Sequence, residues 1–250
     1  MMKALVTGAS SGIGKEIAFY LNDLGYDLYV VARDKKKLDK LYKNVRGKVT
    51  TIEMDLSDEG NCYELYEQLK DEGIDILVNN AGFGDAGNFI ETDLDKELEM
   101  INTNIKAYHI LMKLFLKDFV KRDYGRILNV ASMSGFMPGP YMATYYATKS
   151  YVIKLSLGVA EELMQMNSHV KISLFCPGPV KTNFSNRAHV HFNIGSLSVE
   201  EAGRVAIDGL FRNKILILPN NMKINYILTK LAPLKVIMKV ISMVQERSSK

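Results

Sequence analysis

Short apolar runs alternate along the chain with segments whose apolar residues recur every three or four positions. Runs such as KALVT, DLYVVA and DILVN are apolar almost throughout, which is typical of strands covered by helices on both faces. These runs predict seven strands, near residues 3–9, 27–33, 49–56, 74–82, 125–132, 170–180 and 214–219. Helical spacing predicts the intervening helices, over residues 13–24, 38–45, 64–73, 98–122, 143–165 and 197–211. This alternation predicts a doubly wound α/β fold with a seven-stranded, mostly parallel sheet and helices on both faces.

The composition excludes several classes of protein. The chain has 250 residues, two cysteines and a formal net charge of +4. Two cysteines give no disulfide framework. The mild positive charge suits an anionic cofactor and does not indicate nucleic acid. No linker, repeat or low-complexity stretch interrupts the sequence, so residues 1–250 are expected to form a single domain.

The sequence also carries signals about compartment and metals. The first residues, MMKALVTGAS, lead directly into a strand and show no signal peptide. No apolar run approaches the roughly 18 residues needed to cross a bilayer, so we expect a soluble, cytoplasmic protein. His189 and His191 hint at a metal, but no further Cys, His, Asp or Glu residues cluster with them. No metal site is therefore predicted.

A glycine-rich turn, TGASSGIG, joins the first predicted strand to the first helix. Gly8 permits a tight exit from the strand, Gly12 lets the backbone approach a phosphate without a Cβ, and Gly14 permits close packing of helix on sheet. The free N–H groups at the start of the helix then face a pyrophosphate. The turn therefore predicts a dinucleotide site of the Rossmann type, although its spacing is G-x-x-x-G-x-G.

A second motif, TYYATKSY, carries candidate chemistry. Tyr145 and Lys149 lie four positions apart on a predicted helix and share one face, and Ser132 ends the preceding strand. Ligands of open α/β sheets bind at the carboxyl ends of strands, so these three side chains can converge. In the reduction of a carbonyl group, hydride adds to the carbon and the oxygen becomes alkoxide-like. A hydroxyl group that donates a proton to this oxygen lowers the barrier. A tyrosine loses its proton near pH ~10, and a neighbouring ammonium group lowers that pKa toward the working range.

With these motifs, the sequence resembles the classical short-chain dehydrogenases/reductases over roughly residues 3–220. Each match falls at the expected place among the strands and helices, and the ordered set is far more specific than any one motif. The matching residues are, in chain order, Thr7, Gly8, Gly12, Gly14, Asp55, the NNAG segment 79–82, Asn104, Ser132, Tyr145, Lys149 and the PGPVKT segment 177–182.

The resemblance implies hydride transfer between a nicotinamide and a ketone or secondary alcohol. Tyr145 is then the general acid in reduction and the base in oxidation, Ser132 orients the substrate oxygen, and Lys149 tunes Tyr145 and holds the ribose. Asn104 is expected to hold a water in a proton relay. Dimers or tetramers are expected through the two long helices. The implied cofactor-binding residues are Gly8, Ser10, Ser11, Gly12, Ile13, Gly14, Arg33, Asp55, Leu56, Asn80, Ala81, Gly82, Tyr145, Lys149, Pro177, Gly178, Val180 and Thr182.

Three neighbouring residues compete for the catalytic roles. Tyr146 precedes the lysine by three positions, where the family has four. Ser134 precedes the tyrosine by eleven positions, where the family has thirteen. Asn102 lies farther from the apolar stretch IKAYHIL than Asn104 does. We favour the member of each pair that has the family spacing.

The end of the second strand bears on the choice of cofactor. An acid at this tip would bind the ribose 2′-hydroxyl of NAD, whereas a basic residue favours the 2′-phosphate of NADP. Arg33 presents a planar fork suited to phosphate. Asp34 is the competing candidate, but Ala32 occupies the position where NAD-selective relatives carry the acid. We therefore predict NADP(H) as the cofactor.

The substrate-facing segments are less specific. Phe136, Met137 and Tyr141 follow the predicted catalytic serine, and residues 183–200 are expected to form a lid over the substrate. These apolar and aromatic side chains suit a small hydrophobic carbonyl compound or alcohol.

Residues 220–250 are expected to form an amphipathic C-terminal extension. Apolar residues at helical spacing occur on both sides of Pro233, which is expected to break the helix. Lys223, Lys230, Lys235 and Lys239 are interspersed among these apolar residues. Two alternatives stay open for it: packing over the substrate site or against another subunit, and a weak contact with a membrane surface.

The sequence thus favours an NADP-dependent oxidoreductase. Two other functions compete with it: a membrane-associated lipid or steroid reductase of the same family, and a non-catalytic NADP-binding module. The complete set of serine, asparagine, tyrosine and lysine argues against the module.

Overall fold

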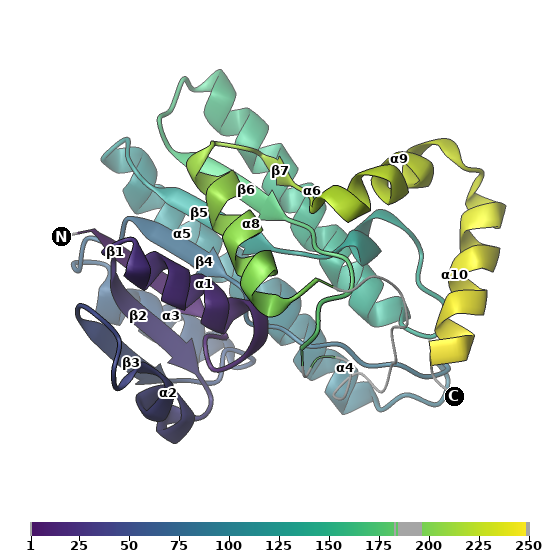
Figure 1. Ribbon diagram of the computed structural model, residues 1–250, viewed down its shortest axis with the longest axis horizontal. Coiled ribbons are helices and arrows are strands. Elements are labelled where there is room, and N and C mark those ends of the chain that lie inside the picture. Colours follow the sequence, from purple (N-terminus) through teal and green to yellow (C-terminus); the bar gives the residue numbers. More distant parts are fainter. Residues whose placement is uncertain (1, 183, 185–196, 249–250) are drawn as a thin grey trace.

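The computed structural model describes residues 2–182, 184 and 197–248. Within these residues, seven strands form one sheet in the order β3-β2-β1-β4-β5-β6-β7, and every neighbouring pair is parallel (Figure 1). The strands are β1 (Lys3–Thr7), β2 (Asp27–Ala32), β3 (Val49–Glu53), β4 (Ile76–Asn79), β5 (Arg126–Val130), β6 (Lys171–Phe175) and β7 (Leu216–Ile217). The predicted doubly wound α/β fold is confirmed, with a sheet that is parallel throughout.

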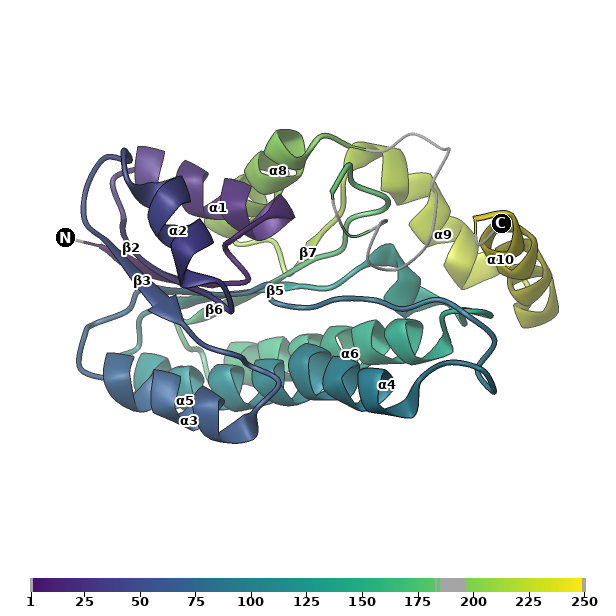
Figure 2. The same ribbon diagram turned by 90° about the horizontal axis from the view of Figure 1, so that it is seen from below.

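Helices cover both faces of the sheet, as the continuous apolar strands require (Figure 2). One apolar core lies between the sheet and α1 (Gly12–Asp23), α2 (Lys35–Tyr42) and α8 (Val199–Phe211). The core on the opposite face is formed with α3 (Glu59–Leu69), α5 (Tyr108–Lys121) and α6 (Ala143–Gln165). Ser198 caps the start of α8, because its side chain accepts a hydrogen bond from the Glu201 N–H.

The strand order reverses between β1 and β4, and this reversal determines where a ligand can lie. Strands β2 and β3 lie on one side of β1, and β4 to β7 lie on the other. Connections leaving the carboxyl ends of β1 and β4 therefore diverge and leave a crevice between them. The glycine turn follows β1, and the segment Asn80–Gly82 follows β4, so both border this crevice.

The long helix predicted over residues 98–122 is divided into three parts. These are α4 (Leu94–Ile101), a π-helical segment η1 (Asn102–Ala107) and α5. A π-helical turn inserts an extra residue and is common at functional sites. Here the side chain of Asn104, which is fully buried, forms hydrogen bonds outside the helix with the backbone of Phe83. These bonds connect the π-helical segment to the segment that follows β4.

The chain ends in two helices separated by a break. A short 3-10 turn, η3 (Asn220–Met222), leads into α9 (Lys223–Leu231), and α10 (Leu234–Ser248) follows. Ala232 is extended, because a residue before proline is disfavoured in the helical region. The predicted break at Pro233 is confirmed. Most of the predicted lid, 183–200, lies outside the described residues, and so do His189 and His191.

Candidate active site

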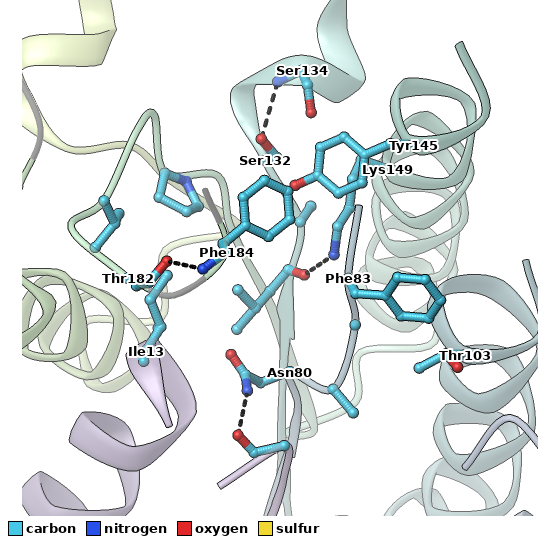
Figure 3. A pocket seen from close by; sticks show the side chains of 18 of the residues that line it. Ile13, Asn80, Phe83, Thr103, Ser132, Ser134, Tyr145, Lys149, Thr182 and Phe184 are labelled. Atoms are coloured by element: carbon cyan, nitrogen blue, oxygen red, sulfur yellow. Dashed lines mark hydrogen bonds between the residues drawn. The ribbon is translucent and has the colours of Figure 1, made fainter. Parts of the chain in front are cut away.

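A cavity of about 790 Å³ lies at the carboxyl ends of the central strands (Figure 3). The glycine turn forms one end of it, and Ser132, Tyr145 and Lys149 form another part of its wall. Most of the predicted site residues line this one cavity: Gly8, Ser10, Ser11, Gly12, Ile13, Arg33, Asp55, Leu56, Asn80, Ala81, Gly82, Ser132, Tyr145, Lys149, Pro177, Gly178, Val180 and Thr182. Gly14 and Asn104 lie behind the wall and do not line it.

The glycine turn can adopt its shape only because Gly8 and Gly12 carry no side chains. Gly8 has a φ of 66°, and a Cβ there would lie 2.8 Å from the Cα of Ala81. Gly12 has a φ of 56°, and a Cβ there would lie 3.3 Å from Cγ2 of Thr182. Both backbone conformations strongly favour glycine. The turn and Thr182 therefore enclose a narrow space at the start of α1, which fits the pyrophosphate of a dinucleotide.

Two polar side chains fix this turn against the next strand. The Thr7 hydroxyl accepts hydrogen bonds from the N–H groups of Asn80 and Ala81, at 2.9 and 3.1 Å. The Asn80 amide donates to the carbonyls of Thr7 and Gly8. Gly14 is needed for the same contact, because a Cβ on it would overlap the Asn80 amide. Asn80 and Gly14 thus maintain the shape of the turn from behind.

The residues after β2 form the basic corner of the cavity. Nη1 of Arg33 lies 2.8 Å from a carboxylate oxygen of Glu99 and 3.8 Å from one of Asp55. Asp34 caps α2, since its carboxylate accepts a hydrogen bond from the Lys37 N–H at 2.9 Å. The Asp34 carboxylate is therefore engaged in the helix cap, whereas Arg33 forms an exposed, exchangeable ion pair.

Tyr145 is buried beside two serine hydroxyls. Figure 3 shows its hydroxyl directed toward Ser132, across from the ring of Phe184. Burial raises the pKa of Tyr145 to about 12, and the hydroxyls of Ser132 and Ser134 partly oppose this shift. Ser132 itself lies two residues after β5 in an extended conformation, and its side chain accepts a hydrogen bond from the Ser134 N–H. The raised pKa keeps the Tyr145 hydroxyl protonated at neutral pH.

Lys149 lies one helical turn after Tyr145, with only 5% of its surface exposed. Its Nζ donates a hydrogen bond of 3.1 Å to the Val130 carbonyl and lies 5.3 Å from the centre of the Tyr108 ring. Its distance from the centre of the Tyr145 ring is 5.9 Å. Burial lowers the pKa of Lys149 to about 8. Among the described residues, no carboxylate forms an ion pair with Lys149.

The Asn104 side chain is fully buried behind the cavity wall. Its amide donates to the carbonyl of Phe83 and to the hydroxyl of Thr148, and its oxygen accepts from the Phe83 N–H. The side-chain amide of Asn104 is therefore already engaged with other groups of the protein. Asn104 therefore fixes the segment after β4 against α6, and the adjacent Thr103 lines the cavity instead.

Several residues that line the cavity were not predicted from the sequence. The C-terminal helices contribute Met222, Asn225, Ile241, Val244 and Gln245 to the wall. Packing over the substrate site was one of the two alternatives left open for this segment, but the apolar spacing did not indicate which of its residues line the cavity. Two expected substrate residues lie elsewhere: Phe136 packs on Tyr226 with ring centres 4.8 Å apart, and Tyr141 borders a separate small depression.

The fold and the cavity together define a dinucleotide-binding oxidoreductase. The family model described as short chain dehydrogenase matches residues 2–191. An uncharacterized short-chain type dehydrogenase/reductase of Sinorhizobium fredii is 35% identical over 189 residues, which cover 74% of this chain and 72% of that protein. The chain therefore belongs to the short-chain dehydrogenase family, whose members use a nicotinamide cofactor.

Solved structures agree with this assignment. A short-chain dehydrogenase from Sphingobium yanoikuyae in complex with NADPH is 29% identical, with a TM-score of 0.83 and coverage of 91% of this chain and 92% of that one. The bulky-bulky ketone specific alcohol dehydrogenase from Comamonas testosteroni is 27% identical, with a TM-score of 0.80 and coverage of 96% and 94%.

Among the described residues, no three His, Cys, Asp or Glu side chains gather in a way that could hold a metal ion.

Proposed function

We propose that the protein is an NADP-dependent oxidoreductase that acts on a hydrophobic ketone or secondary alcohol. The observation that carries this proposal is the position of Ser132, Tyr145 and Lys149 in the wall of the cavity that the glycine turn also borders. Bound NADPH would supply the hydride for reduction. The protein then has to bind the ketone, orient its oxygen and provide a proton.

Tyr145 provides that proton. Its raised pKa keeps the hydroxyl protonated at neutral pH, which is the form that a general acid in reduction requires. Ser132 donates a second hydrogen bond to the substrate oxygen, so negative charge that develops there is stabilised by two hydroxyls. In the oxidative direction the tyrosinate form of Tyr145 accepts the proton from the alcohol.

Lys149 sets how readily Tyr145 releases the proton. A buried ammonium 5.9 Å from the tyrosine ring favours tyrosinate and lowers the tyrosine pKa when Lys149 is charged. We assign it the further role of holding the nicotinamide ribose. For Asn104 we propose that its backbone carbonyl, on the π-helical segment, holds the water of a proton relay, since its side chain is occupied by Phe83 and Thr148.

The preference for NADP rests on the corner after β2. Arg33 offers a guanidinium group at the edge of the cavity, and Lys37 lines the same corner. Asp34, which would favour NAD, is engaged in capping α2. A 2′-phosphate would thus meet two cations and displace a surface ion pair of small stability.

The substrate end of the cavity supports a bulky apolar substrate. Met137, Met142, Tyr146, Phe184 and Ile241 line it, and they leave few polar groups besides the two serines near Tyr145. Such a site is suited to ketones with apolar groups on both sides of the carbonyl. The similarity to the Comamonas testosteroni enzyme, which is specific for bulky-bulky ketones, is consistent with this assignment.

The proposal is tested by measuring NADPH and NADH consumption with ketones that increase in size on each side of the carbonyl. We expect turnover with NADPH, a preference for the bulkier ketones, and loss of turnover in Tyr145→Phe. Binding of NADPH without turnover of any ketone would indicate a non-catalytic module instead.

A further inference from the structure

The outer face of the two C-terminal helices, α9 and α10, is apolar. On α9, Ile224, Ile227, Leu228 and Leu231 are spaced i, i+3, i+4 and i+7 and therefore share one face. Their side chains are 70%, 54%, 54% and 77% exposed. At the corner between the helices Leu234 is also largely exposed, and on α10 a second stripe follows at Val236, Val240 and Met243. Singly exposed apolar residues are common, but a contiguous set marks an interaction surface.

The opposite face of α10 already has a packing role. Ile241, Val244 and Gln245 line the cavity, and Gln245 is 3% exposed. A surface helix that packs on one face normally carries polar residues on the other. In α10 the outward face carries Val236, Val240 and Met243, so its apolar character is not explained by packing within the described chain.

Positive charge is concentrated around this apolar surface. Lys223, Lys230, Lys235 and Lys239 are all exposed on the two helices. No acidic residue occurs between Asp208 and Glu246, a stretch that holds six basic residues. The rest of the chain has 26 basic and 28 acidic residues. The net positive charge of the protein is therefore contributed by this stretch.

We propose that the outer face of α9 and α10 docks on an anionic lipid surface. Lysines attract the helices to anionic headgroups, and the exposed apolar side chains then insert among the acyl chains. No described helix is long and apolar enough to cross a bilayer, so the contact is peripheral. A second copy of the chain fits this surface less well, because a two-fold interface would bring the same lysines together.

This docking has a consequence for the cavity. The inner face of α10 forms part of the cavity wall, so a docked helix places that wall beside the lipid phase. A hydrophobic ketone dissolved in the bilayer would then reach the site without crossing water. This consequence rests on the proposed function, whereas the docking itself does not.

Cosedimentation with lipid vesicles tests the docking. The vesicles are made of phosphatidylcholine alone or of phosphatidylcholine with roughly a third phosphatidylserine. We expect binding to the anionic vesicles, weakening with salt, and little binding to the neutral ones. Replacing Lys223, Lys230, Lys235 and Lys239 with Gln should weaken binding by more than about tenfold. The matched control replaces four exposed lysines on and after α2, Lys36, Lys40, Lys43 and Lys48, and should bind like the wild type.

The apolar contribution is tested separately with Ile224→Gln/Leu231→Gln, two of the most exposed positions on α9. This variant should bind anionic vesicles more weakly while its thermal unfolding and its affinity for NADPH stay unchanged. Equal binding to neutral and anionic vesicles, or an equal loss in both lysine variants, would overturn the proposal. So would a dimer in light scattering that dissociates in Ile224→Gln/Leu231→Gln while vesicle binding is absent. Because no readout depends on turnover, failure here is distinguishable from failure of the proposed function.

Discussion

The side-chain amide of Gln245 donates a hydrogen bond of 2.7 Å to the hydroxyl of Tyr146, which lies 99 residues earlier in the chain. Tyr146 follows Tyr145 on α6, and their rings meet edge to face at 6.2 Å. Both partners of this bond are buried. The bond therefore fixes α10 against the helix that carries the predicted catalytic tyrosine, and it makes the C-terminal extension part of the cavity wall.

Loss of this hydrogen bond should weaken substrate binding and leave cofactor binding intact. In Gln245→Leu we expect KM for a ketone to rise roughly fivefold, because a buried hydrogen bond contributes about 1 kcal/mol. The affinity for NADPH, measured by fluorescence titration, should not change. The double variant with Tyr146→Phe should resemble either single variant, since both remove the same bond. Additive effects of the two changes would contradict this interpretation.

Tyr145 and Tyr146 form a matched pair for testing the proton donor. Tyr145→Phe should lower kcat by about 10²- to 10⁴-fold, the range usual for loss of a general acid. Its Kd for NADPH should stay close to that of the wild type. Tyr146→Phe removes a hydroxyl from the adjacent position and should retain most of kcat. The assignment would be wrong if Tyr146→Phe were the inactive variant.

Arg33 should determine the choice between NADPH and NADH. In Arg33→Asp we expect KM for NADPH to rise roughly 10- to 100-fold, because a hydrogen-bonded charge pair is lost. KM for NADH should change little. Asp34→Ala is the control: it removes the cap of α2 and should cost about 1 kcal/mol in unfolding free energy while leaving the cofactor preference unchanged. A shift of preference in Asp34→Ala would reassign the role to that residue.

Glu99 should compete with the cofactor for Arg33. Nη1 of Arg33 lies 2.8 Å from the Glu99 carboxylate, and a 2′-phosphate has to replace this contact. Glu99→Gln should therefore lower the Kd for NADPH by about two- to fivefold, as expected from an exposed ion pair. Binding of NADH should not improve. Calorimetric titration at low and moderate salt measures both, and equal improvement for the two cofactors would exclude the competition.

The buried charge of Lys149 should lower the unfolding free energy of the protein by a measurable amount. Its folded pKa is lowered to about 8 by burial, and that of the unfolded chain stays near 10.5. Below pH 8 both states are protonated and the full cost of the buried charge is present. Between pH 8 and pH 10.5 the unfolded state binds more protons than the folded state, so the unfolding free energy rises with pH. Lys149→Met removes the charge and should raise the unfolding free energy at pH 7 by about 2 kcal/mol.

Chemical denaturation at several values between pH 7 and 9.5 measures this effect, and the wild type should approach the variant as pH rises. The range stays below pH 10, where ionisation of tyrosines in the unfolded chain would interfere. Lys149→Met leaves the Val130 carbonyl with a partner, because Tyr108 also donates to it at 3.1 Å. A variant that is less stable than the wild type at pH 7 would contradict the cost assigned to Lys149. The variant should also lack activity.

Local patterns were sufficient to predict the strands, most helices and the glycine turn. Apolar runs required cover on both faces, and the positive φ values at Gly8 and Gly12 fit a turn that only glycine adopts easily. The offset of four residues placed Tyr145 and Lys149 on one face of α6. The π-helical segment at Asn104 was not predicted, because it depends on a hydrogen-bond partner after a different strand.

The sequence by itself therefore determined the fold class, the family and the residues that border the crevice. These follow from periodicity, from glycine conformation and from the rule that parallel strands present their carboxyl ends together. Only the tertiary structure decided that Asn104 bonds to Phe83 behind the cavity wall, that Arg33 pairs with Glu99, and that Gln245 reaches Tyr146. Each of these contacts joins residues distant in the chain, and side-chain pairing across packed elements leaves no periodic signal along the sequence.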